Sequence, residues 1–295
     1  GDGGGGGGNG EYAYDGKPSF STINLRDIGS RVDLTFYESH KGEIYSNFSS
    51  PRGYALIISN ERFRTMPERR GTRVDMNALH TLFSSLGYEV QVQENLSSKD
   101  LLHSISTFAS SSSHSFTSSV VLCVLTHGEH DALFGVDDEL VSTHRILSCF
   151  NSINAPNLAG KPKIILLQAC RGERKDRGWD DTDSGRPLEF LSCLRGEGSR
   201  MLTRRKSPAE ADLIVAYATP PLHVSWRNSE KGSWFIQAFV EVVKKRAVDS
   251  DLLSILTLVN EKVANSFEAT HERFKQIPEH HSRLTKKFFF FPPNN

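Results

Sequence analysis

Short apolar runs alternate with amphipathic segments along most of the chain. Five runs have the length and the apolar or alternating pattern of a β-strand: 54–58, 88–92, 120–125, 164–167 and 213–218. Between and after these runs, apolar residues recur at helical spacing, as Leu79, Leu82 and Phe83 do in the first of these segments. A final apolar run, Phe288–Phe291, predicts a sixth strand.

Polar residues mark where several of these helices begin. Thr72-x-x-Asp75 and Ser97-x-x-Asp100 each look like a capping box, in which two side chains bond to free N–H groups of the first helical turn. Ser142 precedes a third helix, and two more helices are expected over 235–242 and 252–263. Strands and helices therefore alternate through the body of the chain.

This alternation predicts an α/β fold with a mostly parallel six-stranded sheet and helices on both faces, which makes three layers. Such sheets bind ligands beyond the carboxyl ends of their strands. His127-Gly128, Cys170, the polar loop 60–73 and residues 226–228 each follow one of the expected strands. We therefore expect these four segments to meet at one edge of the sheet and to form a site there.

Composition narrows the class of protein. The 295 residues, 37% of them hydrophobic, can form one large domain or two small ones. Thirty-five basic and 35 acidic residues cancel, so we expect neither a nucleic-acid partner nor a membrane partner. Four cysteines are too few for a disulfide scaffold and favour a reducing, cytoplasmic location. No apolar run approaches the roughly 18 residues of a membrane span.

Cys170 and His127 are the candidate catalytic pair. A free thiol titrates near about 8.5, so a nucleophilic cysteine needs a neighbouring base, and His127 is the candidate. The amides of Gly128 and Cys170 could hold the oxyanion that forms when a thiolate attacks a carbonyl. A packed thiol at Cys170 and a structural histidine at 127 are the alternatives. Neither C-x-x-C nor H-x-x-x-H spacing occurs, so we expect no metal, and no organic cofactor is implied.

Three motifs carry a resemblance to a known family. Together these motifs resemble the caspases, and their sequences are most like those of the nematode cell-death member. They are Thr126-His-Gly-Glu, Gln168-Ala-Cys-Arg-Gly-Glu and Ser225-Trp-Arg-Asn-Ser. The resemblance covers roughly residues 53–291. It implies the caspase-like three-layer fold and a cysteine endopeptidase that cleaves after aspartate through an acyl-enzyme, with a role in apoptosis.

The resemblance also implies a substrate site. Two arginines and a glutamine would read the aspartate side chain, and here they match Arg69, Gln168 and Arg227, with Arg70 the competitor of Arg69. A guanidinium left without a carboxylate is costly, so such a pocket rejects neutral side chains. A solvated loop charge is the alternative for Arg69.

Four further residues carry over from the family to the sites upstream of aspartate. Val224 and Trp226 would line the site for the side chain before aspartate, while Asn228 and Trp234 would contribute to a more distant one. A tryptophan of the core is the alternative for Trp234. Val224 replaces the tyrosine of many relatives, which puts the fine specificity in doubt.

Family members are zymogens, and two segments fit processing. Residues 174–208 are too long and polar for an ordinary connection, and Asp183 is the expected cut between a large subunit, 51–183, and a small subunit, 184–295. A charged disordered loop is the alternative. Residues 1–50 are expected to form a flexible glycine-rich leader or short prosegment, with a possible cut at Asp15.

Self-association is a further implication of the family. The strand predicted at Phe288–Phe291 would pair with its twin across a twofold axis, giving a dimer of cut large and small subunits. Burial of these phenylalanines within one monomer is the alternative. Protein substrates with aspartate before the scissile bond are the other expected partners.

Two other functions compete with this interpretation. A non-catalytic homologue that binds and regulates a true protease would keep the fold without the activity. A nucleotide-binding doubly wound protein is disfavoured, because no glycine fingerprint follows the first strand.

Overall fold

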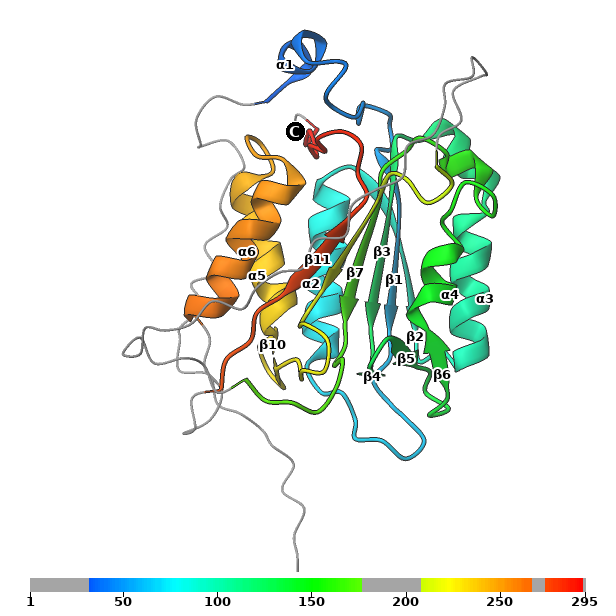
Figure 1. Cartoon of the computed structure of the whole chain (residues 1–295), viewed down its shortest axis with the longest axis vertical. Helices are drawn as coiled ribbons and strands as arrows, with labels where there is room; N and C mark the ends of the chain where they lie inside the picture. The colour runs from blue at the N-terminus through cyan, green and yellow to red at the C-terminus, as the bar shows by residue number, and fades with distance from the viewer. Residues whose placement is uncertain (1–31, 177–207, 267–273, 294–295) are drawn as a thin grey trace, which may run out of the picture.

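The computed structural model describes residues 32–176, 208–266 and 274–293. A six-stranded sheet with the strand order β11-β8-β7-β3-β1-β2 forms its centre (Figure 1). The strands are β1 Gly53–Ser59, β2 Tyr88–Glu94, β3 Ser119–Leu125, β7 Lys163–Gln168, β8 Leu213–Tyr217 and β11 Glu279–Ser282. All neighbours pair in parallel except β11, which runs antiparallel to β8. The predicted mostly parallel α/β sheet is therefore confirmed.

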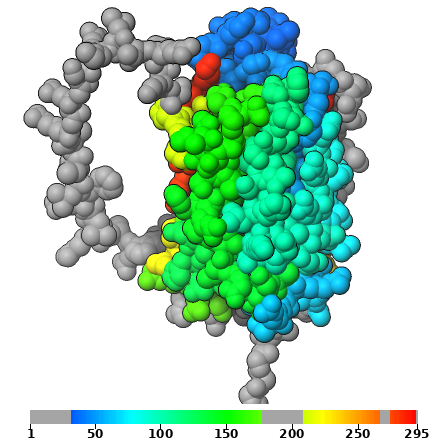
Figure 2. Space-filling view, turned by 90° about the vertical axis from the view of Figure 1, so that its right-hand side faces the viewer, coloured from blue at the N-terminus to red at the C-terminus, as the bar shows by residue number. Residues whose placement is uncertain are grey.

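Helices cover both faces of this sheet. Helices α2 (Thr72–Ser85), α5 (Trp234–Arg246) and α6 (Leu252–Ser266) lie on one face, and α3 (Ser98–Ala109) and α4 (Thr143–Ser148) on the other (Figure 1). Figure 2 views the second face, where α3 and α4 form the cyan and green surface. No helix in the described ranges has the length and apolar character needed to cross a membrane.

Each face of the sheet has its own apolar core, and the strands supply both. Successive strand residues point to opposite faces. Ala55 and Ile57 of β1 enter the core under α2, α5 and α6, whereas Leu56 and Ile58 enter the core under α3 and α4. This explains why β1, β3, β7 and β8 appear as nearly continuous apolar runs.

Short elements complete the fold. Strands β4 (Gly128–Glu129), β5 (Ala132–Phe134) and β6 (Leu140–Ser142) form a small antiparallel sheet directly after β3. Strands β9 (Arg227–Asn228) and β10 (Gly232–Ser233) form a hairpin before α5. Two 3₁₀ turns precede strands of the central sheet: η1 (Ser112–Phe116) comes before β3, and η2 (Pro156–Leu158) before β7.

One of the two predicted capping boxes is wrong. Ser97 does cap α3, since its hydroxyl accepts from the N–H of Asp100 at 3.2 Å. At α2 the cap is Gly71, in the left-handed region with φ 85°, and no side chain caps the helix. Asp75 instead accepts hydrogen bonds from Ser233 and Gln237, which lie more than 150 positions along the chain. Only the tertiary fold brings those partners to the first turn of α2.

The prediction of a strand at Phe288–Phe291 is also wrong. The sixth strand is β11, whose polar sequence Glu-His-His-Ser shows no strand pattern. Phe288 and Phe290 join the core under α5 and α6, and Phe289 and Phe291 pack with Tyr37 and Ile44. The phenylalanines are thus buried within the monomer, and β11 forms the edge of the sheet.

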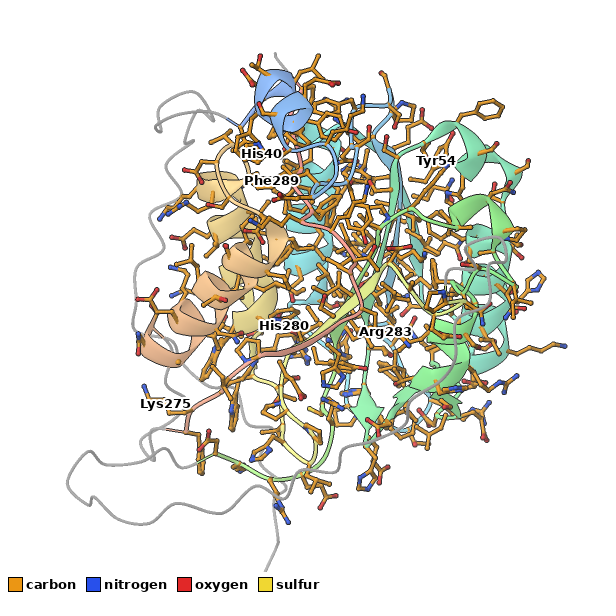
Figure 3. The ribbon with its side chains drawn as sticks, turned by 45° about the horizontal axis from the view of Figure 1, so that its top comes forward. His40, Tyr54, Lys275, His280, Arg283 and Phe289 are labelled. Carbon is orange, nitrogen blue, oxygen red and sulfur yellow. The ribbon has the colours of Figure 1, made fainter. Side chains whose placement is uncertain are left out.

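Of the leader expected over residues 1–50, the structure describes residues 32–50. Residues 32–50 pack on the protein, with α1 formed by Leu34–Ser39. The Asn47 side chain donates to the carbonyls of Phe289 and Phe290 at 3.2 and 3.0 Å. Figure 3 labels Phe289 and His40 at this end of the molecule, where both rings contact Phe36. The first and last described segments therefore hold each other in place.

Candidate active site

The four segments expected to converge do so at the carboxyl ends of β1, β3, β7 and β8. The N–H of Thr126, after β3, donates to the carbonyl of Gln168 at the end of β7 at 3.1 Å. Gly128 backs directly onto the cysteine, because a Cβ at this position would lie 2.6 Å from the carbonyl oxygen of Cys170. Glycine is therefore required for the close approach of the histidine and cysteine segments.

His127 is held as a neutral imidazole. Its Nε2 lies 2.8 Å from the carbonyl oxygen of Pro67, which can only accept, so Nε2 carries the proton and Nδ1 is the free base. The ring also packs against Phe63, with centroids 4.6 Å apart. Burial, with the charges of Arg69 and Arg227, lowers the pKa of His127 to about 4. The side chain is thus a proton acceptor at neutral pH.

Cys170 is half-buried and its thiol rests on Ser225. The Ser225 N–H donates to Sγ at 3.4 Å, and the Ser225 hydroxyl lies 3.6 Å from Sγ. The same hydroxyl accepts from Gln168 Nε2 at 3.2 Å. Ser225 is a site residue that was not predicted, although its place inside the Ser-Trp-Arg-Asn-Ser motif was an available signal. Burial raises the pKa of Cys123, so that thiol is no competing nucleophile.

The structure brings Arg69, Gln168 and Arg227 together, with Arg69 and Gln168 buried and Arg227 half-buried. Arg69 is 1% exposed and donates to the Asn60 carbonyl and the Thr72 hydroxyl, whereas Arg70 is exposed. The structure thus favours Arg69 over Arg70 as the buried cation. Gln168 is fully buried, and its Oε1 has no hydrogen-bond partner among the described residues.

Neither guanidinium group forms a direct ion pair within the described residues. Burial lowers the pKa of Arg69, and the charge of Arg227 lowers it further. Burial also lowers the pKa of Arg227, whose Nε donates to the Arg70 carbonyl at 2.6 Å. Within the described ranges, no carboxylate forms an ion pair with either group. An incoming carboxylate would therefore find two cations that have no direct ion-pair partner.

Trp226 and Trp234, two of the residues predicted to line the sites for the substrate side chains before aspartate, belong to an aromatic stack. Trp226 lies between Trp234 and Phe274, with ring centroids 6.0 and 5.7 Å apart, and each of the three is at most 5% exposed. Gln276 holds the stack in place, since its Oε1 accepts from the backbone N–H of Trp226 at 2.7 Å. Phe274 and Gln276 were not predicted, because neither lies in one of the motifs that carry the family resemblance.

Val224 and Asn228 have more local roles in this structure. Val224 packs against the core under α5, and its N–H donates to the Arg174 carbonyl at 2.9 Å. The Asn228 side chain accepts from the N–H groups of Glu230 and Lys231, which closes the turn between β9 and β10. Both residues lie in the same short segment as Arg227, which belongs to the predicted pocket.

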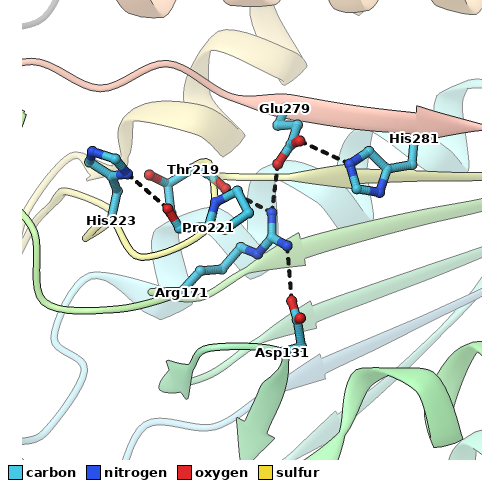
Figure 4. Close-up of polar contacts among 7 residues, drawn as sticks. All are labelled: Asp131, Arg171, Thr219, Pro221, His223, Glu279 and His281. Carbon is cyan, nitrogen blue, oxygen red and sulfur yellow. Dashed lines mark hydrogen bonds and ion pairs between the residues drawn. The ribbon is translucent and has the colours of Figure 1, made fainter. Parts of the chain in front are cut away.

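Arg171, the residue after the cysteine, ties the site to the sheet edge (Figure 4). Its guanidinium donates to Glu279 of β11 at 2.6 Å and to Asp131 of the β4–β5 turn at 2.9 Å. It also lies over the ring of Tyr217, 4.1 Å from the centroid. One cation therefore links the cysteine segment, the histidine hairpin and the edge strand.

This arrangement can be compared with known proteins. A family model described as the caspase domain matches residues 52–289. The chain belongs to the caspase family. Cysteine-type endopeptidase is the enzyme class that goes with this family. Asp183 and Asp15, the expected processing positions, lie outside the described residues.

Individual relatives agree with this assignment. Cell death protein 3 of Caenorhabditis remanei is 44% identical over 269 residues, covering 84% of this chain and 52% of that protein. The chain thus spans about half the length of this nematode caspase. Caspase-3 of Xenopus laevis is 35% identical, covering 92% of this chain and 90% of that one. The crystal structure of caspase-1 from Spodoptera frugiperda superposes with a TM-score of 0.74 at 32% identity, over 84% of this chain and 93% of that chain.

Proposed function

We propose that this protein is a caspase-type endopeptidase that hydrolyses peptide bonds after aspartate, using Cys170 and His127 as its catalytic dyad. One observation carries the aspartate preference: two guanidinium groups, the buried one of Arg69 and the half-buried one of Arg227, lie beside the cysteine and form no direct ion pair with a carboxylate of the described chain. A substrate carboxylate supplies the missing charge, whereas an asparagine leaves both cations unpaired at about 2–5 kcal/mol.

The reaction follows from the side chains present. His127 Nδ1 takes the thiol proton of Cys170, and the thiolate attacks the backbone carbonyl carbon of the substrate aspartate. The N–H groups of Gly128 and Cys170 stabilise the oxyanion. The protonated imidazole then gives its proton to the leaving amine, and water attacks the acyl-enzyme with His127 again acting as base.

The chain is proposed to be a zymogen that is cut after Asp183, and after Asp15 in the leader. The sheet supports this, because β7 belongs to the expected large subunit and β8 to the small one, and their pairing survives a cut between them. Self-association of the cut protomers would use the edge strand β11 instead of Phe288–Phe291. A role in apoptosis, in the cytoplasm, is proposed from the family and from the printed name of the nematode relative.

The test compares the wild-type chain with Cys170→Ala by mass spectrometry and with fluorogenic peptides ending in aspartate, asparagine or lysine. We expect the wild type to break after Asp183 and to hydrolyse the aspartate peptide alone, while the variant stays whole and inactive. Two intact and inactive chains, even after the linker is cut deliberately, would refute the proposal and favour a regulatory homologue.

A further inference from the structure

Asp75 is a buried carboxylate that contacts the hairpin carrying Arg227. It is 0% exposed. The Ser233 N–H donates to its Oδ1 and Oδ2 at 2.9 and 3.0 Å, and Gln237 Nε2 donates to Oδ1 at 2.8 Å. Ser233 lies directly opposite Arg227 in the β9–β10 hairpin. A Cβ at Gly232 would come within 2.3 Å of Oδ1, so the carboxylate is seated against the hairpin backbone.

The charge of Asp75 acts on both pocket cations. It is the strongest charge that favours the protonated form of Arg227, and it favours the protonated form of Arg69 as well. Glu61, in the loop after β1, acts on both in the same sense but more weakly. Asp75 lies on α2, immediately after the loop that holds Arg69, so it faces the pocket from a different element than the hairpin.

The anchoring role alone does not require a charge. Ser233 and Gln237 both reach Oδ1, so the carbonyl oxygen of an asparagine could accept both hydrogen bonds. Burial raises the pKa of Asp75 to about 6, against the lowering effects of Gln237, Ser233 and Arg69. Burial thus makes this carboxylate harder to ionise than it would be in water, and the charge of Arg69 offsets part of that cost.

We propose that Asp75 is the internal counter-ion of the aspartate pocket. It is a positioning residue: it holds the hairpin that carries Arg227 and balances the charges of Arg69 and Arg227 until a substrate carboxylate arrives. This inference rests on the proposed function. Because the substrate carboxylate and Asp75 repel each other, Asp75 takes up a proton when substrate binds near pH 6, and the substrate then supplies the pocket's negative charge.

The experiment measures kcat and KM for a fluorogenic peptide ending in aspartate, between pH 5.5 and 8, for the full chain and two variants. In the wild type we expect KM to fall about three- to tenfold from pH 7.5 to 5.5, a modest coupling between two sites. Asp75→Asn keeps both hydrogen bonds, so its KM is low and constant with pH. Asp75→Ala loses the anchor as well, so its KM rises at least about tenfold at every pH.

The matched control is Asp212→Asn, at the opposite end of the sheet. Asp212 is also buried, and its Oδ1 accepts from Tyr45 and Thr285 at 2.6 Å each. This variant keeps the wild-type dependence of KM on pH. If Asp75→Asn retains the wild-type pH dependence, or raises KM as Asp75→Ala does, the inference is overturned while the proposed function stands. An inactive wild type overturns both. If the alanine variant does not fold, the pH dependence of KM in Asp75→Asn decides the question by itself.

Discussion

Truncation of Phe290 tests whether the C-terminal phenylalanines belong to the core of the monomer. Phe290 is 0% exposed and packs edge-on against Phe288, with ring centroids 5.1 Å apart. Removing a fully buried phenylalanine leaves a cavity and costs about 3–5 kcal/mol. In a domain of this size each kcal/mol lowers Tm by about 2–4 °C, so Phe290→Ala should lower Tm by roughly 6–20 °C.

The assay is thermal unfolding followed by circular dichroism, with size-exclusion chromatography of the same samples. Phe116→Ala is the matched control, since Phe116 is 84% exposed and its removal should change stability by no more than about 0.5 kcal/mol. If Phe290→Ala melts at the same temperature as the control, the burial argument is refuted. If it also changes the oligomeric state, the phenylalanines form an association surface instead.

Three further predictions concern the site. Because the pKa of His127 is lowered to about 4, the base stays neutral above that pH, so kcat/KM should show no acid limb near pH 6.5; such a limb in the pH profile would contradict the buried imidazole. Arg69→Gln should reduce kcat/KM for an aspartate peptide by about 10²–10⁴, with little change for an asparagine peptide, and equal losses for both would show that the pocket does not read charge. Glu279→Gln weakens the ion pair of Arg171, whose side chain is 8% exposed, and should lower the free energy of unfolding in urea by about 1.5–3 kcal/mol. Its control is Glu210→Gln, from an exposed pair with Arg283, which should lower that free energy by at most about 1 kcal/mol.

The sequence predicted the parallel strands because a strand buried on both faces must be apolar throughout. It also predicted which segments meet, since the carboxyl ends of parallel strands share one edge. His127, Gly128, Cys170, Arg69, Gln168 and Arg227 were all named on that basis or through family motifs, and the structure brings them together.

The errors occur where a residue's partner is distant in the chain. Glu279–Ser282 forms a strand because the edge of β8 offers it backbone hydrogen bonds, and its own side chains give no such signal. Phe288–Phe291 has the apolar pattern of a strand, yet two of its rings enter the main core and the other two pack on residues 32–48.

The sequence by itself therefore determined the parallel strands and the edge at which the candidate residues meet, because local pattern and strand ends suffice for those, whereas Arg69, Gln168 and Arg227 were expected from the family resemblance. Only the tertiary structure decided that Ser225 contacts the thiol, that Gln276 fixes Trp226 and that Asp75 accepts from Ser233, which lies opposite Arg227. Each of these contacts joins residues more than 45 positions apart, and burial gives them their strength by removing water from polar groups that then need a protein partner.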